Sequence, residues 1–333
     1  MIPEKTVFIL GAGASCPYNY PSGAKLKEDI CGNETSVIIN LIKRHIPSAD
    51  FTNPLVNEFE KQVLEFVKKF KQSPDSIDLF LYSNPSQSDI GKKLILLYIF
   101  HAERVTRFFH NSIDKRDWYT RIFSEMRRGF HDPTSCLELG DNNVVFITFN
   151  YDRSLEYFFY NSLINSFEKN KPEEIIRTFN KIPIHHVYGK IASFPWEDTE
   201  SKGSQVINFL QSVEWNHFHK SVNFKSLSLL KENIKTIYER QQMNFDEMQE
   251  IFKDAKRIFF LGFGFAEENI EVLKKMVPNI SDIQIFATVK GMGAVDRHRA
   301  DQSIYETFNM AGRAQYIKIE DIDCLDMLEK HFF

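Results

Sequence analysis

The opening segment constrains the fold of this chain most: the apolar residues 7–10 pass directly into the turn sequence Gly11-Ala12-Gly13-Ala14-Ser15. A short apolar run that ends in small residues is typical of a buried strand, a tight turn and a helix start. In an α/β protein such a turn leaves main-chain amides at the helix N-terminus, where phosphate binds. Glycine also permits close approach of a pyrophosphate. The alternative is a tight turn that binds no ligand.

Five further runs resemble this first strand. They are rich in β-branched and aromatic residues and nearly continuous, as expected of parallel strands that are buried on both faces. The predicted strands are residues 7–10, 144–149, 184–188, 258–261, 283–289 and 316–319. They predict an α/β fold with a Rossmann-like parallel sheet flanked by helices.

The interval between the first two strands has no comparable strand and shows helical periodicity instead. Phe59, Val63, Phe66 and Phe70 recur at helical spacing, and a second helix is expected from Gly91 to Phe108. We therefore expect a Rossmann-like domain made of residues 1–30 and 141–333, interrupted by a large helical insertion at 31–140. A further helical stretch is expected from Lys225 to Met243.

Composition limits the function classes. The formal net charge is −4, so no overall basic field favours nucleic acid or an anionic membrane surface. The four cysteines are isolated, which disfavours a structural zinc module, and we expect no metal site. No signal peptide or long apolar stretch is evident, so the expected location is the cytoplasm.

Asn150 and Asp152 follow the second predicted strand, at the sheet edge where open α/β sheets bind ligands. Two residues apart in an extended segment, their side chains share one side of the backbone. Asn supplies a donor and an acceptor, and Asp supplies a charge that binds a carboxamide or a ribose hydroxyl. The alternative role is helix capping, which both residue types favour.

The third predicted strand carries His185 and His186, followed by Tyr188 and Gly189. Strand alternation sends the two histidines to opposite faces, so at most one reaches the cleft. A histidine there suits general base catalysis near neutral pH, although a histidine in an apolar strand is more often a core residue.

The fourth strand repeats the pattern of the first, because it runs into Gly262-Phe263-Gly264-Phe265, with Asn269 shortly after. In this order, GAGAS, Thr-Phe-Asn-Tyr-Asp, the His-containing strand before Gly189 and the late Gly-Phe-Gly-Phe segment resemble the sirtuin superfamily. They resemble more closely the zinc-free sirtuin-like NAD-hydrolase domains of bacterial anti-phage defence systems. The segment Ser76-Ile77-Asp78 resembles a recurrent segment of the same proteins.

The resemblance implies a role for each matched position. Gly11, Ala12, Gly13 and Ser15 would hold the phosphates of NAD+, and Gly262, Gly264 and Asn269 the adenosine half. The implied catalytic set is Asn150, which would orient water beside the nicotinamide ribose, with Asp152 on the nicotinamide side and His186 as the catalytic histidine. Sirtuins place histidine immediately before the glycine, where this chain has Tyr188, so the catalytic position falls to His186 or Tyr188.

The expected function is that of an NAD+ glycohydrolase, with NAD+ as substrate and no further cofactor. The resemblance implies an anti-phage effector that acts by abortive infection, a homo-oligomer, and activation by a HerA-like translocase ATPase. The alternatives are an NAD-dependent protein deacylase or ADP-ribosyltransferase, and a non-catalytic sensor of NAD+ or ADP-ribose. The absence of the zinc cysteines disfavours the deacylase.

Overall fold

A computed structural model shows a single six-stranded sheet in which every neighbouring pair is parallel, in the order β3-β2-β1-β4-β5-β6. The structure describes residues 1–32, 54–105, 117–129, 135–167, 172–194, 224–237, 239, 244–280, 282–310 and 314–332. The strands are β1 Thr6–Leu10, β2 Val144–Thr148, β3 Ile184–His186, β4 Arg257–Leu261, β5 Gln284–Thr288 and β6 Ile317–Glu320. All six predicted strands are present, and the Rossmann-like α/β class is confirmed.

A row of aromatic rings crosses one face of the sheet. Phe8 stacks on Phe146 at 5.2 Å and on Phe259 at 5.4 Å, and Phe259 stacks on Phe286 at 4.6 Å between ring centroids. The parallel register places these residues directly opposite one another on adjacent strands. Offset stacking between neighbouring strands adds to the stability that burial provides. Part of the phenylalanine content of this chain is therefore a stack across the centre of the sheet.

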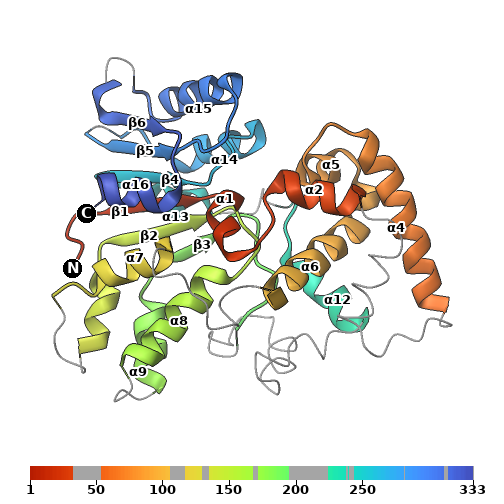
Figure 1. Ribbon diagram of the computed structural model, residues 1–333, viewed down its shortest axis with the longest axis horizontal. Coiled ribbons are helices and arrows are strands. Elements are labelled where there is room, and N and C mark those ends of the chain that lie inside the picture. Colours follow the sequence, from red (N-terminus) through yellow and green to blue (C-terminus); the bar gives the residue numbers. More distant parts are fainter. Residues whose placement is uncertain are drawn as a thin grey trace.

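Helices cover both faces of the sheet (Figure 1). Phe159 of α8 packs on Phe146, and Phe332, just after α16, packs edge-on against Phe8. Phe260 points to the other face, where it meets Phe308 at the end of α15. The helices near the sheet are α7 Trp118–Met126, α8 Ser154–Ser166, α9 Pro172–Asn180, α13 Phe245–Lys253, α14 Glu267–Met276, α15 Ala294–Thr307 and α16 Cys324–His331.

A separate group of helices, here called the helical lobe, lies beyond the carboxyl ends of the strands (Figure 1). Phe59, Phe66 and Phe70 of α4 are buried in it, as their spacing predicts. The lobe consists of α2 Gly23–Gly32, α4 Pro54–Gln72, α5 Ile77–Ser83, α6 Ser88–Val105 and α12 Phe224–Leu230. The short helices are α1 Ala12–Ser15, η1 Cys16–Tyr18, η2 Pro85–Gln87, η4 Ser135–Asp141, η5 Lys231–Asn233 and η7 Ala314–Tyr316.

The lobe and the predicted insertion at 31–140 overlap without coinciding. Helix α2 begins at Gly23 and already packs on α4 and α6, and α12 joins from later in the chain. Helix α7 falls inside the predicted range, yet it contacts α8 and α16 beside the sheet. The expected end of the second helix at Phe108, and residues 238 and 240–243 of the later helical stretch, lie outside the described residues. Lys92 and Glu239, 2.7 Å apart, tie the later segment to α6.

Candidate functional site

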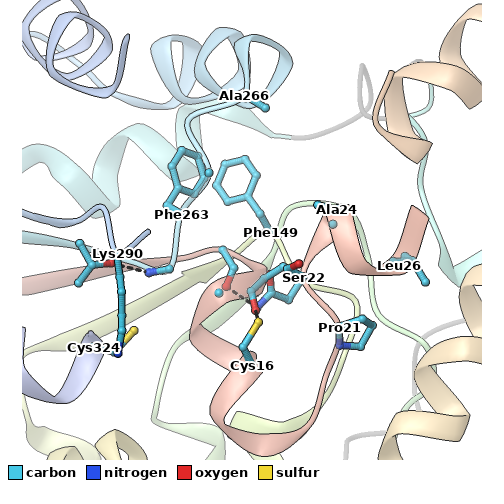
Figure 2. A pocket seen from close by; sticks show the side chains of 18 of the residues that line it. Cys16, Pro21, Ser22, Ala24, Leu26, Phe149, Phe263, Ala266, Lys290 and Cys324 are labelled. Atoms are coloured by element: carbon cyan, nitrogen blue, oxygen red, sulfur yellow. Dashed lines mark hydrogen bonds between the residues drawn. The ribbon is translucent and has the colours of Figure 1, made fainter. Parts of the chain in front are cut away.

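A cavity of about 1250 Å³ lies at the carboxyl edge of the sheet and is lined in part by residues of the helical lobe. Figure 2 shows lining side chains spread from Lys290 and Cys324 on one side to Pro21 and Leu26 on the other. Its walls come from the turns after β1, β2, β4 and β5, together with the first residues of α2 and α5. Typical ligand pockets measure roughly 300–1,000 Å³, so this cavity has room for an elongated ligand of dinucleotide size.

Two glycine turns form the floor of the cavity and pack directly on each other. Gly11 N–H donates to Leu261 O at 3.1 Å, and Gly13 N–H donates to Gly262 O at 3.0 Å. A β-carbon on Gly11 would lie 2.5 Å from the Gly262 carbonyl oxygen. Gly262 has φ 58°, and a β-carbon there would lie 2.0 Å from Ala14 N. Contact between the two turns thus requires these glycines, whatever ligand the cavity takes.

The contact between the two turns occupies main-chain amides that the sequence predicted would bind phosphate. The N–H groups of Gly11 and Gly13 already donate to the β4 turn, and Ala14 N–H donates to Gly11 O at 2.9 Å. Gly11, Ala12 and Gly13 do line the cavity, whereas Ser15 is buried and is not among the lining residues. Gly264 also lines the cavity, and a β-carbon there would meet open space.

Asn150 lies in the cavity wall, held by its side-chain amide. Nδ2 donates to Gly11 O at 2.9 Å and to Ser15 Oγ at 3.0 Å, and the Asn150 main-chain N–H donates to Thr148 Oγ1 at 3.0 Å. A main-chain carbonyl only accepts hydrogen bonds, so the atom facing Gly11 O must be the nitrogen. The carbonyl oxygen Oδ1 has no hydrogen-bond partner among the described residues. It is free to accept a hydrogen bond from a water or a ribose hydroxyl.

Asp152 also lines the cavity, and it orders the start of α8. Its Oδ1 accepts from Ser154 N–H at 3.0 Å and from the Ser154 hydroxyl. Burial raises the pKa of this carboxyl, and the Ser154 hydrogen bonds oppose that rise. Asp152 therefore forms a turn just before α8 rather than its N-cap, which is Arg153 without a side-chain cap, and it does so from the wall of the cavity.

The two histidines of β3 do point to opposite faces. His186 lies against α8, where Nε2 is 2.6 Å from Glu156 Oε1 and Nδ1 is 3.0 Å from Asn150 O. Burial lowers the pKa of His185, and Glu247 of α13 opposes that effect from the other face. Neither histidine lines the cavity. The strand ends at His186, two residues earlier than expected, and the turn that follows carries Tyr188 into the cavity wall.

Tyr188 belongs to an aromatic wall of the cavity that the sequence motifs did not predict. The Tyr188 hydroxyl donates to Asn269 Oδ1, and its ring lies 5.9 Å from those of Phe149 and Tyr151. Phe149 in turn packs edge-on against Phe263 at 5.0 Å. The aromatic wall could have been predicted from the sequence, because these aromatic residues adjoin the polar and glycine motifs at the strand ends.

The helical lobe reaches this wall through the first turn of α5. The Tyr151 hydroxyl donates to Asp78 Oδ1, and the Ser76 hydroxyl donates to Glu268 Oε1 of α14 at 2.9 Å. Ser76, Asp78 and Glu268 all line the cavity. The Ser76-Ile77-Asp78 segment is therefore part of the site and connects the lobe to the sheet domain.

The far side of the cavity is polar and mixed in charge. Gly262 N–H donates to Thr288 Oγ1 at 2.8 Å, and Lys290 Nζ lies 3.1 Å from Asp323 Oδ2. Burial raises the pKa of the Cys324 thiol to about 12, and it also raises the pKa of Cys16. Both thiols line the cavity, and their raised pKa values disfavour the thiolate form that nucleophilic chemistry requires.

A buried group of charges lies behind the cavity wall. Glu156 accepts from Arg153 Nε at 2.8 Å and contacts His186, and all three side chains are at most 7% exposed. Burial by itself raises the pKa of Glu156, but Arg153 and His186 hold it well below its usual range. Glu103 of α6 lies near this group, and its Oε2 atom is buried without a hydrogen bond to any described residue. Burial first, and the charge of Asp152 second, raise its pKa well above the usual range.

Among the described residues, no cluster of His, Cys, Asp and Glu is arranged to hold a metal ion. No described helix is long and apolar enough to cross a membrane. Comparison of the chain with protein-family models gives no match, and comparison with curated proteins gives none either.

Proposed function

We propose that this protein is an NAD+ glycohydrolase that cleaves NAD+ to nicotinamide and ADP-ribose. In this reaction the bond between ribose C1′ and the nicotinamide nitrogen breaks, and its electron pair leaves with neutral nicotinamide. Water attacks C1′ and loses a proton to solvent. Three features support the proposal: the sheet order, the size of the cavity, and the arrangement of Asn150.

The sheet order β3-β2-β1-β4-β5-β6 is the order of dinucleotide-binding Rossmann folds. In such sheets the ligand binds outside the carboxyl ends of the strands, where the chain reverses direction across the sheet. That point lies between β1 and β4, where the two glycine turns meet at the floor of the cavity. An elongated dinucleotide suits the length over which the lining residues are spread.

The observation that carries the proposal is the open Oδ1 atom of Asn150 in this cavity. Its NH₂ group is tied to Gly11 and Ser15, so the direction of Oδ1 is fixed before any ligand arrives. A fixed acceptor at this place can orient one water or one ribose hydroxyl toward C1′. The departing nicotinamide is neutral and the ribose becomes cationic, so neither a strong acid nor a strong base is required. None of the described residues that line the cavity is a histidine, which is compatible with that chemistry.

The lack of a histidine among the described lining residues also favours a second candidate, a sensor that binds NAD+ or ADP-ribose without turnover. Incubation of the purified protein with NAD+ separates the two. Release of nicotinamide and ADP-ribose without any added acceptor supports the hydrolase. Saturable binding without products at long times supports the sensor, and release only on addition of an acylated peptide or acceptor protein supports a deacylase or transferase.

The cellular role that we propose is depletion of NAD+ during phage infection, and it rests on the resemblance to sirtuin-like defence proteins. Unregulated cleavage of NAD+ would kill the host, so we propose control through homo-oligomerisation or a HerA-like ATPase partner. Loss of cellular NAD+ only when the chain, its partner and a phage are all present would support this role.

A further inference from the structure

His186 is buried between the turn that carries Asn150 and the first turn of α8. Nδ1 lies 3.0 Å from the Asn150 main-chain oxygen, and Nε2 lies 2.6 Å from Glu156 Oε1. A main-chain carbonyl only accepts hydrogen bonds, and so does an ionised carboxylate. Both ring nitrogens therefore face acceptors, an arrangement that fits a ring carrying a hydrogen on each. Such a ring has no lone pair left with which to remove a proton.

We infer that His186 is a positioning residue, which fixes Asn150 through the main-chain carbonyl and is itself anchored by Glu156. This inference rests on the proposed function, because it assigns a role in the same reaction. It gives His186 a different task from the general base that the sequence resemblance implies.

The other hydrogen bonds of the turn after β2 show why the bond from His186 to the Asn150 main-chain oxygen matters. Phe149 N–H donates to Leu10 O at 2.9 Å, Asn150 N–H donates to Thr148 Oγ1, and Ile191 N–H donates to Tyr151 O at 3.0 Å. Within the described part of the chain, His186 is the single donor to Asn150 O. Without the His186 donor, the peptide unit after Asn150 is held less firmly. The direction of the Asn150 Oδ1 atom depends on the position of that peptide unit.

The anchor behind His186 is hydrogen-bonded and shielded from water. Glu156 also accepts from Arg153 Nε at 2.8 Å, and the Arg153 guanidinium lies over the Phe194 ring at 4.5 Å. The exposed side-chain fractions are 1% for Arg153, 5% for Glu156 and 7% for His186. Charge-assisted hydrogen bonds in such surroundings are shorter and stronger than neutral ones. The imidazole can therefore transmit a fixed position from α8 to Asn150.

Two amide substitutions test this inference, because each replaces one ring nitrogen. An asparagine side chain places its NH₂ near the position of Nδ1, and a glutamine side chain places its NH₂ near that of Nε2. Positioning predicts that His186→Asn keeps kcat for NAD+ cleavage within about tenfold of wild type. His186→Gln should lose ~10²-fold in kcat with little change in KM, since small displacements of a catalytic group cost about that much. His185→Asn, on the opposite face, is the matched control.

Other outcomes overturn the inference. Equal and severe losses of kcat in both variants would assign His186 a role as a base, because neither amide accepts a proton at neutral pH. Lowered thermal stability with unchanged kcat in both would make the histidine merely structural. A kcat near wild type in His186→Gln but not in His186→Asn would show that the link to Glu156 acts without Asn150.

A spectroscopic readout separates this inference from the proposed function. In ¹H–¹⁵N spectra without NAD+, the Asn150 side-chain amide signal should be native-like in His186→Asn and displaced or broadened in His186→Gln. If wild type fails to cleave NAD+ but the amide signals follow this pattern, the positioning contact holds and the proposed reaction is wrong. An Asn150 signal that is identical in wild type and both variants would refute the contact itself.

Discussion

The side-chain amide of Asn150 donates a 2.9 Å hydrogen bond to the main-chain oxygen of Gly11, 139 residues earlier in the chain. This bond joins the turn after β2 to the turn after β1, on adjacent parallel strands. Because the amide nitrogen is used in this way, the side-chain oxygen is the group left to face the cavity. One residue thus couples the local fold of the site to its proposed chemistry.

Asn150→Ala should abolish NAD+ cleavage while the protein remains folded at 25 °C. The variant removes the Asn150 donor from Gly11 O, which keeps its hydrogen bond from Ala14 N–H, so the free energy of unfolding should fall by about 0.5–1.5 kcal/mol. Activity assays with circular dichroism and thermal unfolding check both effects. The matched control is Asn143→Ala, at the other end of β2, where an exposed amide donates to Pro3 O. Full activity in Asn150→Ala, or its complete unfolding, would contradict the role given to this side chain.

Gly262 and Gly264 form a second matched pair. Gly262→Ala should destabilise the protein by roughly 2–4 kcal/mol, because backbone strain at positive φ and overpacking against Ala14 add together. Gly264→Ala should leave thermal stability near wild type, since no atom of the described residues lies within 4 Å of its β-carbon position. If Gly264→Ala raises KM for NAD+ at unchanged thermal stability, bound NAD+ contacts the backbone at Gly264. Equal stability losses in both variants would contradict the packing account.

Much of the fold and part of the candidate site could be predicted from the sequence. Its apolar runs predict the six strands, and its strand-end motifs predict that Asn150, Asp152 and Gly262 meet at one edge. Alternation also separates His185 from His186. The reason for the early glycines could not be predicted, because it depends on contact with a turn about 250 residues later. Two other features could not be predicted either: the end of β3 at His186, and the contact between Glu156 of α8 and the His186 ring.

Tyr188→Phe tests the alternative assignment of the sirtuin histidine position. The substitution removes the hydroxyl that donates to Asn269 but keeps the ring in the aromatic wall. A phenol, with an ordinary pKa of about 10, is a poor base at neutral pH. We expect kcat to stay within about tenfold of wild type and KM to rise, measured from initial rates of nicotinamide release. A loss of kcat of ~10²-fold or more at unchanged thermal stability would give the catalytic role to Tyr188.

Glu103→Gln should stabilise the protein increasingly as the pH rises above the ordinary pKa of glutamate, 4.5. The pKa of Glu103 is raised by burial and by Asp152, so the folded protein keeps a proton that the unfolded chain has lost. Wild type therefore loses stability with rising pH, by up to about 1.4 kcal/mol per pH unit, until folded Glu103 ionises. Glutamine has no such titration. Urea unfolding of both proteins between pH 4 and pH 8 checks this, and a difference independent of pH would contradict it.

The most direct test of the central claim measures the products that NAD+ gives when water is the only acceptor present. Wild type and Asn150→Ala are incubated with NAD+ in buffer without an added acceptor, and the products are separated and identified by mass spectrometry. We predict equal amounts of nicotinamide and ADP-ribose from wild type, and no products from Asn150→Ala. Binding of NAD+ by wild type without nicotinamide release, with or without a translocase partner, would contradict the account.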